Sequence, residues 1–172
     1  MLNSKIIGLL NDQINKELYS AYLYLDMSNY FEHKGLCGFA NWYYIQAQEE
    51  RDHAMLIYKY LHNNDVKVSL LPIAKPDKTF NNDLSVLEEA LRHEEYVTAL
   101  IHKIYAETEL CDDYRTREFI SWFVTEQDEE ETNARDMINK LELFGTDGCG
   151  LYLLNKELAK REYEAPKGVN IE

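Results

Sequence analysis

Four glutamates interrupt the apolar patterns of this chain, and their side chains could bind cations. In four stretches, apolar residues recur three or four positions apart, as they do on the buried face of a helix. Near the middle of each stretch, a glutamate takes a place where this repeat calls for an apolar residue. If the stretches are helices of one bundle, the four carboxyl groups meet at one height in its core. The four residues are Glu17, Glu50, Glu94 and Glu130.

Carboxylates buried in this number require positive charge nearby. An ionised carboxylate without a partner costs several kcal/mol in a protein core. A purely structural bundle would pair the four with Lys or Arg, but no basic residue lies at this height on the apolar faces. Two divalent cations would neutralise four carboxylates. The pattern therefore predicts a site for two metal ions.

The second stretch adds an imidazole to the carboxylates. Glu50 and His53 are three positions apart, so on a helix their side chains lie within about 60° of each other and can bind the same ion. Di-iron sites in bundle cores combine single glutamates with such Glu-x-x-His pairs. Oxygen-rich ligation with an imidazole suits Fe²⁺, although affinity alone would also admit Zn²⁺.

The elements that must position these residues are long helices joined by one long loop. Extended, residues 64–82 could cover about 60 Å, whereas a helix of about 30 residues measures about 45 Å. The loop can therefore cross the whole bundle and join two helical hairpins. We expect an all-α protein of one domain, residues 1–172: a four-helix bundle with one long crossover loop and a short fifth C-terminal helix. The expected helices are 4–33, 36–63, 83–112, 115–144 and 147–163, and residues 164–172 are expected to fray.

Composition excludes several classes of partner. The formal net charge of −13 argues against nucleic acid, because phosphate binding needs a basic surface. The three cysteines form no C-x-x-C pair, which favours a reducing compartment. Neither a signal peptide nor an apolar run of about 18 residues occurs, so we expect a cytoplasmic protein without a membrane partner.

Four motifs carry a resemblance to a known family. The segments KELYSAYLYLDMS, QAQEERDHA, EALRHEE and WFVTEQDEEE resemble those of bacterial non-haem ferritins, which belong to the ferritin-like di-iron carboxylate proteins. The resemblance covers essentially the whole chain. It implies that Glu17, Glu50 and His53 hold a first iron ion. It also implies that Glu50 bridges to a second ion held by Glu94 and Glu130, with Gln127 nearby.

The same resemblance implies a third iron site beside the first two. Its ligands would come from the acidic run of the fourth helix and from the second helix. Asp128 and Glu131 are left out, because a run of this length wraps around a helix and part of it must face solvent. The implied third-site residues are Glu49, Glu126, Glu129 and Glu130.

Other residues near the motifs receive simpler interpretations. Tyr24 lies seven positions after Glu17, hence on the same face, and the resemblance places it beside the iron centre. Trp122 matches an aromatic residue near that site, although packing in the core is its favoured role. His93 should point away from Glu94. All histidines other than His53 are expected at the surface or the rim: His33, His62, His93 and His102.

Missing residues separate this chain from other ferritin-like proteins. Bacterioferritins carry a second Glu-x-x-His in the fourth helix, whereas Gln127 to Glu130 contains no histidine. They bind haem through a methionine at the position of Asp52, so haem is not expected here. A rubrerythrin would need four cysteines for its additional iron site, and only three are present.

The resemblance implies a ferroxidase that also stores iron. Such a protein oxidises Fe(II) with O₂ or H₂O₂ at the two-iron centre and keeps the ferric mineral inside a cage of about 24 identical subunits. The alternative is a di-iron carboxylate oxidase or oxygenase that acts on an organic substrate. Such an enzyme would need a substrate pocket beside the metal ions.

Overall fold

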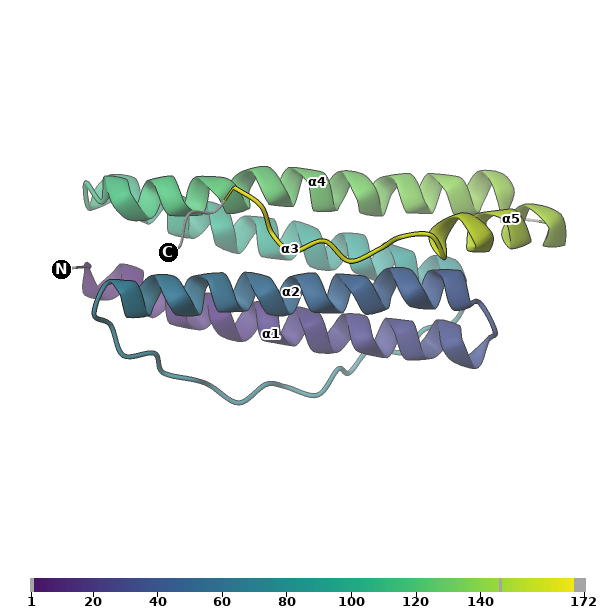
Figure 1. Cartoon of the computed structure of the whole chain (residues 1–172), viewed down its shortest axis with the longest axis horizontal. Helices are drawn as coiled ribbons and strands as arrows, with labels where there is room; N and C mark the ends of the chain where they lie inside the picture. The colour runs from purple at the N-terminus through teal and green to yellow at the C-terminus, as the bar shows by residue number, and fades with distance from the viewer. Residues whose placement is uncertain (1, 146, 169–172) are drawn as a thin grey trace.

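The computed structural model describes residues 2–145 and 147–168, and its regular structure is entirely helical. Four long helices lie side by side and a short one extends from one end of the bundle (Figure 1). This arrangement confirms the expected all-α fold. The helices are α1 (Ser4–His33), α2 (Cys37–Asn63), α3 (Asp83–Leu110), α4 (Tyr114–Phe144) and α5 (Gly148–Leu158).

The crossover loop runs the length of the bundle beside α1 (Figure 1). It returns the chain to the end at which α2 began, so α2 and α3 run in the same direction. Two side chains of α1 hold the loop: the amide of Asn15 donates to the carbonyl oxygen of Pro72 at 3.1 Å, and the backbone N–H of Ser69 donates to Asn11 at 2.7 Å. Asn82 and Ser85 then form a capping box that begins α3.

The core consists of two apolar clusters with a polar layer between them. One cluster includes Phe31 and Phe39 and lies toward α5. The other includes Leu10 and Phe123 and lies toward the opposite end. On each long helix, the residues between the clusters are the polar ones, so the expected common height is observed. The buried polar residues of this layer include Glu17, Glu50, His53, Glu94, Gln127 and Glu130.

One expectation for α3 was wrong. His93 is 8% exposed and its ring nitrogen Nε2 lies 2.7 Å from the hydroxyl oxygen of Ser20 on α1. The buried face of α3 is wide enough to include both His93 and Glu94, although adjacent positions differ by about 100° around a helix. His93 therefore belongs to the polar layer and not to the surface or rim.

The last helix ends earlier than its pattern indicated. α5 stops at Leu158, five residues before the expected end at 163. The backbone of α5 packs so closely on α2 that a Cβ at Gly38 would lie 1.7 Å from the carbonyl oxygen of Asn155. Beyond Leu158, the chain runs back along the bundle between α2 and α4 (Figure 1). The side-chain amide of Asn41 donates to the carbonyl oxygen of Arg161 at 3.0 Å, which directs this return.

Among the described helices, none is both long enough and apolar enough to cross a membrane.

Candidate metal centre

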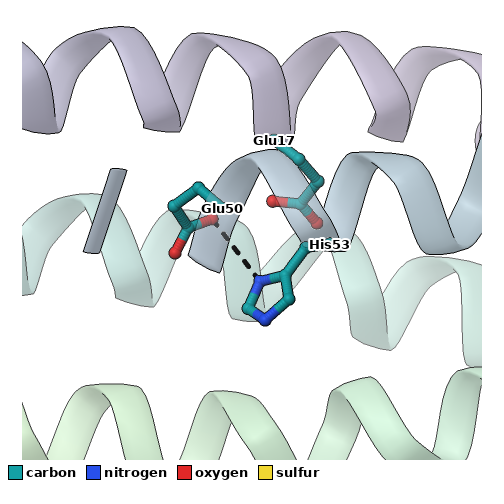
Figure 2. A group of neighbouring side chains, drawn as sticks. All are labelled: Glu17, Glu50 and His53. Atoms are coloured by element: carbon teal, nitrogen blue, oxygen red, sulfur yellow. Dashed lines mark ion pairs between the residues drawn. The ribbon is translucent and has the colours of Figure 1, made fainter. Parts of the chain in front are cut away.

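Glu17, Glu50 and His53 form the tightest group of potential ligands in the described part of the chain. Glu17 comes from α1 and the other two from α2 (Figure 2). One ligand atom from each residue lies within 4.8 Å of the others, and all three side chains are buried. His53 Nδ1 lies 3.6 Å from Glu50 Oε2. This is the carboxylate and imidazole set that one Fe²⁺ or Zn²⁺ ion would accept.

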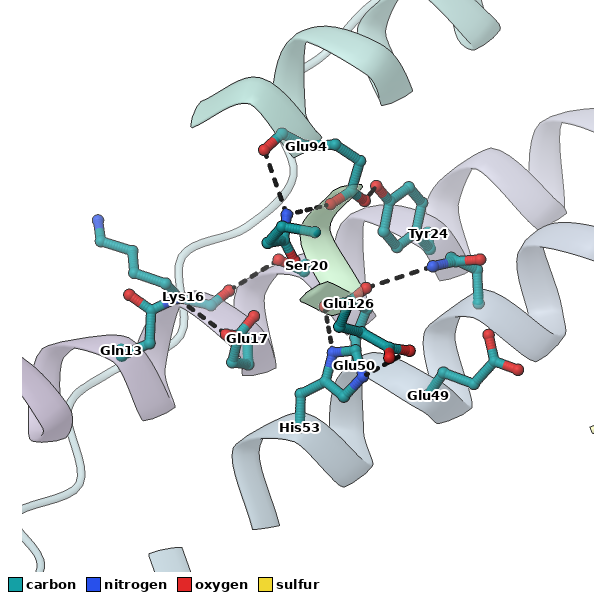
Figure 3. A network of polar contacts seen from close by, with 12 residues as sticks. Gln13, Lys16, Glu17, Ser20, Tyr24, Glu49, Glu50, His53, Glu94 and Glu126 are labelled. Carbon is teal, nitrogen blue, oxygen red and sulfur yellow. Dashed lines mark hydrogen bonds and ion pairs between the residues drawn. The ribbon is translucent and has the colours of Figure 1, made fainter. Parts of the chain in front are cut away.

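Glu94 and Glu130 bring two further buried carboxyl groups from α3 and α4. The hydroxyl of Tyr24 donates to Glu94 Oε1, as Figure 3 shows. Gln127 Nε2 donates to the other oxygen of Glu94 at 3.1 Å. Tyr24 and Gln127 therefore each hold one oxygen of the Glu94 carboxyl group. The structure places all the residues expected at the two-iron centre in one layer.

Two glutamines orient the carboxyl groups of the first group. Gln13 Nε2 donates to Glu17 Oε1 at 2.8 Å, and Gln46 Nε2 donates to Glu50 Oε1 at 3.4 Å. The second oxygen of Glu17 is buried and has no hydrogen-bond partner among the described residues. An unpaired buried oxygen is costly, and a bound cation would satisfy it.

Burial suppresses the charge on most of these carboxyl groups. It raises the pKa of Glu17 to about 8, and the negative charge of Glu50 adds to the effect. The same two causes raise the pKa of Glu94 to about 8. Burial and the charge of Glu94 raise the pKa of Glu130 well above its ordinary value. Near neutral pH and without metal, these three carboxyl groups therefore hold protons.

Glu50 and His53 behave differently, because they stabilise each other as an ion pair. Burial alone would raise the pKa of Glu50, but the hydrogen bond and charge of His53 lower it. Burial alone would lower the pKa of His53, but Glu50 raises it to about 10. A metal ion that binds here must therefore displace protons from the imidazole and from the neutral carboxyl groups.

A carboxylate-lined cavity of about 490 Å³ adjoins this centre. Oε1 of Glu126, which lines the cavity, lies 3.9 Å from His53 Nε2. The His53 imidazole therefore faces Glu50 through Nδ1 and the cavity through Nε2. Asp128 is exposed, and Glu131 instead accepts from Thr98 at 2.7 Å, which agrees with leaving both out. The cavity brings together all four residues of the implied third site, Glu49, Glu126, Glu129 and Glu130.

Trp42 and Arg161 are among the residues of the cavity lining that the sequence patterns missed. Arg161 lies beyond the last helix, where periodicity offers no signal. Trp122 was expected to pack mainly in the core. It is half-buried, its ring lies 5.6 Å from that of His53, and its Nε1 donates to the carbonyl oxygen of Lys167 at 3.0 Å. Trp122 is therefore also part of the cavity wall.

Comparisons with known proteins agree with this geometry. A match to the family described as ferritin-like domain covers residues 7–144. A bacterial non-heme ferritin of Campylobacter jejuni is 38% identical over 156 residues, which is 91% of this chain and 93% of that protein. A bacterial non-heme ferritin of Staphylococcus saprophyticus is 36% identical over 95% of this chain and 98% of its own length.

Solved structures give the same result. An open-pore ferritin from the hyperthermophilic archaeon Archaeoglobus fulgidus superposes with a TM-score of 0.91 at 40% identity, over 94% of this chain and 100% of that one. A form of the same ferritin engineered to be closed reaches 0.93 at 39% identity, over 95% and 100%. By its bundle, its glutamate layer and its similarity over nearly the whole length, this chain belongs to the ferritin family.

Proposed function

We propose that this protein is an iron-storage ferritin that oxidises Fe(II) at a centre within each subunit and retains the ferric product. The observation that carries the proposal is the layer of buried carboxyl groups from all four long helices, with His53 beside Glu50 and an unpaired oxygen on Glu17. The named ferritins among its relatives support the storage role. The carboxylates of the adjoining cavity make an organic-substrate oxidase the less favoured alternative.

Each residue has a defined part in this proposal. Glu17 and His53 bind the first Fe(II) ion, Glu94 and Glu130 bind the second, and Glu50 lies between them as the bridging ligand. Two Fe(II) ions supply one electron each, and O₂ or H₂O₂ accepts the pair. Once metal binding has displaced their protons, the carboxylate ligands stabilise the higher charge of the ferric product, and no separate general base is assigned. Tyr24 and Gln127 contribute by holding Glu94 in position.

The adjoining cavity has a role as a transit site in this proposal. Glu130 lines it and also belongs to the two-iron centre. An ion that leaves the centre would meet Glu49, Glu126 and Glu129 next. Burial raises the pKa of Glu49 and of Glu126 above the ordinary value of a glutamate.

The assembly is proposed to be a hollow cage of about 24 identical subunits. The similarity to Archaeoglobus fulgidus ferritins supports this assignment. The exposed apolar side chains Leu25, Leu70 and Leu71 on α1 and the crossover loop also suit contacts between subunits. The absence of haem and the cytoplasmic location stay predictions from the sequence.

The test is anaerobic loading of the metal-free assembly with Fe(II), followed by air. Storage requires each purified particle to retain far more iron than its binding centres can hold. Retention of only about two ions per chain, with no mineral, would favour the oxidase. If no tight binding occurs, both functions are excluded.

A further inference from the structure

The segment after α5 covers the carboxylate-lined cavity. This return segment, residues 159–168, is held at several points along its length. Besides the Asn41 and Trp122 contacts, the hydroxyl of Tyr163 donates to Asp52 of α2. Six of its residues line the cavity: Arg161, Glu162, Glu164, Ala165, Pro166 and Lys167.

Arg161 connects this segment directly to a cavity carboxylate of α2. Its Nη2 lies 2.5 Å from Glu49 Oε2, and its Nη1 donates to Gln46 Oε1 at 2.9 Å. Its guanidinium also stacks on Trp42 at 4.1 Å from the ring centroid. The side chains of Arg161 and Glu49 are only 17% and 16% exposed, so this pair is shielded from solvent far more than an ordinary surface pair.

The same guanidinium reaches the two-iron centre through one intermediate side chain. Gln46 accepts from Arg161 through its oxygen and donates through its nitrogen to Glu50 at 3.4 Å. The guanidinium therefore fixes which end of the Gln46 amide faces Glu50. The Arg161 side chain therefore both supplies a positive charge to the cavity wall and orients Gln46 beside Glu50.

We propose that Arg161 is a built-in counter-cation of the cavity and thereby a determinant of how strongly the cavity holds metal ions. The Arg161 guanidinium pairs with the Glu49 carboxylate, so an incoming cation must displace the guanidinium before Glu49 can act as a ligand. The cavity then passes ions on instead of retaining them. The other basic residue of the lining, Lys167, pairs with Glu164 of the same segment. The transit role rests on the proposed function.

A purely mechanical role is the competing explanation. Arg161 would then only anchor the return segment, and any loosening of that segment would change metal binding equally. Tyr163→Phe separates the two, because it removes an anchoring contact with Asp52 without changing charge. Arg92→Gln controls for net charge, because Arg92 is an exposed residue of α3 that pairs with Glu89.

The experiment is a Tb³⁺ titration of the intact assembly, with the enclosed centre first saturated with Zn²⁺, followed by luminescence excited through tryptophan. The Zn²⁺ is needed because the Trp122 ring also lies 5.6 Å from that of His53 and would sensitise Tb³⁺ bound at the enclosed centre. Both tryptophans of the chain, Trp42 and Trp122, line the cavity, so the signal then reports ions bound there. We expect Arg161→Gln to tighten Tb³⁺ binding by about tenfold or more, because a positive charge beside the site is lost. Tyr163→Phe and Arg92→Gln should stay within about twofold of the unaltered protein.

Two results would overturn the proposal. One is unchanged or weaker Tb³⁺ binding by Arg161→Gln, and the other is equal tightening by Tyr163→Phe. Failure of the proposed function would show separately, as an unaltered protein that does not oxidise or retain Fe(II), which the Tb³⁺ titration does not measure.

Discussion

The two carboxylate sites of this subunit solve the problem of repelling charges in different ways. The proposed two-iron centre is enclosed by four helices, and its surplus carboxyl groups are kept neutral by protons. The adjoining cavity is partly open, and Arg161 neutralises one of its carboxylates. We therefore expect metal binding to release protons at the first site and to displace a guanidinium at the second. The degree of burial therefore decides whether surplus carboxyl groups are neutralised by protons or by a basic side chain.

The largest expected effect comes from removing a ligand of the enclosed site. Glu17→Ala or His53→Ala should slow the fast phase of Fe(II) oxidation by about 100-fold, because loss of one ligand leaves the first ion weakly held. Stopped-flow absorbance after mixing with air-saturated buffer measures this rate. The matched control is Asp12→Asn, an exposed acidic residue of the same helix, which should leave the rate unchanged. Normal kinetics in both ligand variants would remove the site assignment.

The next effect is the pH dependence of metal binding at the enclosed site. Glu17 and Glu94, with pKa values of about 8, hold protons at pH 6 that a metal ion must displace. Zn²⁺ affinity should therefore rise by about tenfold per pH unit between pH 6 and 8 for each proton released per ion. Calorimetry in buffers of different ionisation enthalpy counts these protons. Binding that is independent of pH would contradict the protonated state.

The same protons also affect the stability of the metal-free protein. A carboxyl group whose folded pKa is raised keeps its proton when the unfolded chain has already lost it, so it favours folding at low pH. That contribution is lost as the pH rises through about 8 for Glu17 and Glu94. We expect the metal-free protein to melt at a lower temperature at pH 8 than at pH 6. Saturating Zn²⁺ should reverse this order.

A smaller effect is expected from a residue that orients a ligand. Tyr24→Phe removes the hydroxyl that donates to Glu94. It should lower the affinity for the second ion about fivefold, because one hydrogen bond contributes about 1 kcal/mol. Zn²⁺ titration should show the first ion unaffected. Equal weakening of both ions would mean that Tyr24 supports the whole layer. Tyr22→Phe, on the exposed face of α1, is the control.

The smallest effect should come from the most exposed carboxylate of the cavity. Glu129 is exposed, so Glu129→Gln is expected to weaken Tb³⁺ binding in the cavity by only about twofold, because solvent screens its charge. Zn²⁺ binding at the enclosed centre should not change. If Glu129→Gln lowers the Tb³⁺ affinity as much as Glu49→Gln does in the same titration, the two carboxylates are equally shielded from solvent.

Much of the enclosed site could be predicted from the sequence, since it depends on helical periodicity. Glutamates that replace apolar residues at the same height of four helices must converge in any bundle of parallel or antiparallel axes. The spacing from Glu17 and the resemblance placed Tyr24 beside the centre, but its hydrogen bond to Glu94 was seen only in the structure. His93 was misplaced because the apolar pattern of α3 indicated a narrower buried face than the bundle creates.

The cavity wall could not be predicted in the same way. The end of α5 at Leu158 and the return of the chain depend on contacts with α2, including the amide of Asn41. Segments without regular structure have no repeat from which facing residues can be inferred. The pairing of Arg161 with Glu49 joins residues 112 positions apart.

The sequence alone determined the four long helices, the height of the glutamate layer and the chemical character of its ligands, because helical geometry is local and repeats along the chain. Only the tertiary structure decided which residues neutralise those ligands. Burial, which depends on all four helices together, raises the pKa of Glu17 and Glu94. The path of the chain after α5 brings Arg161 into contact with Glu49, and no local sequence pattern predicts this contact.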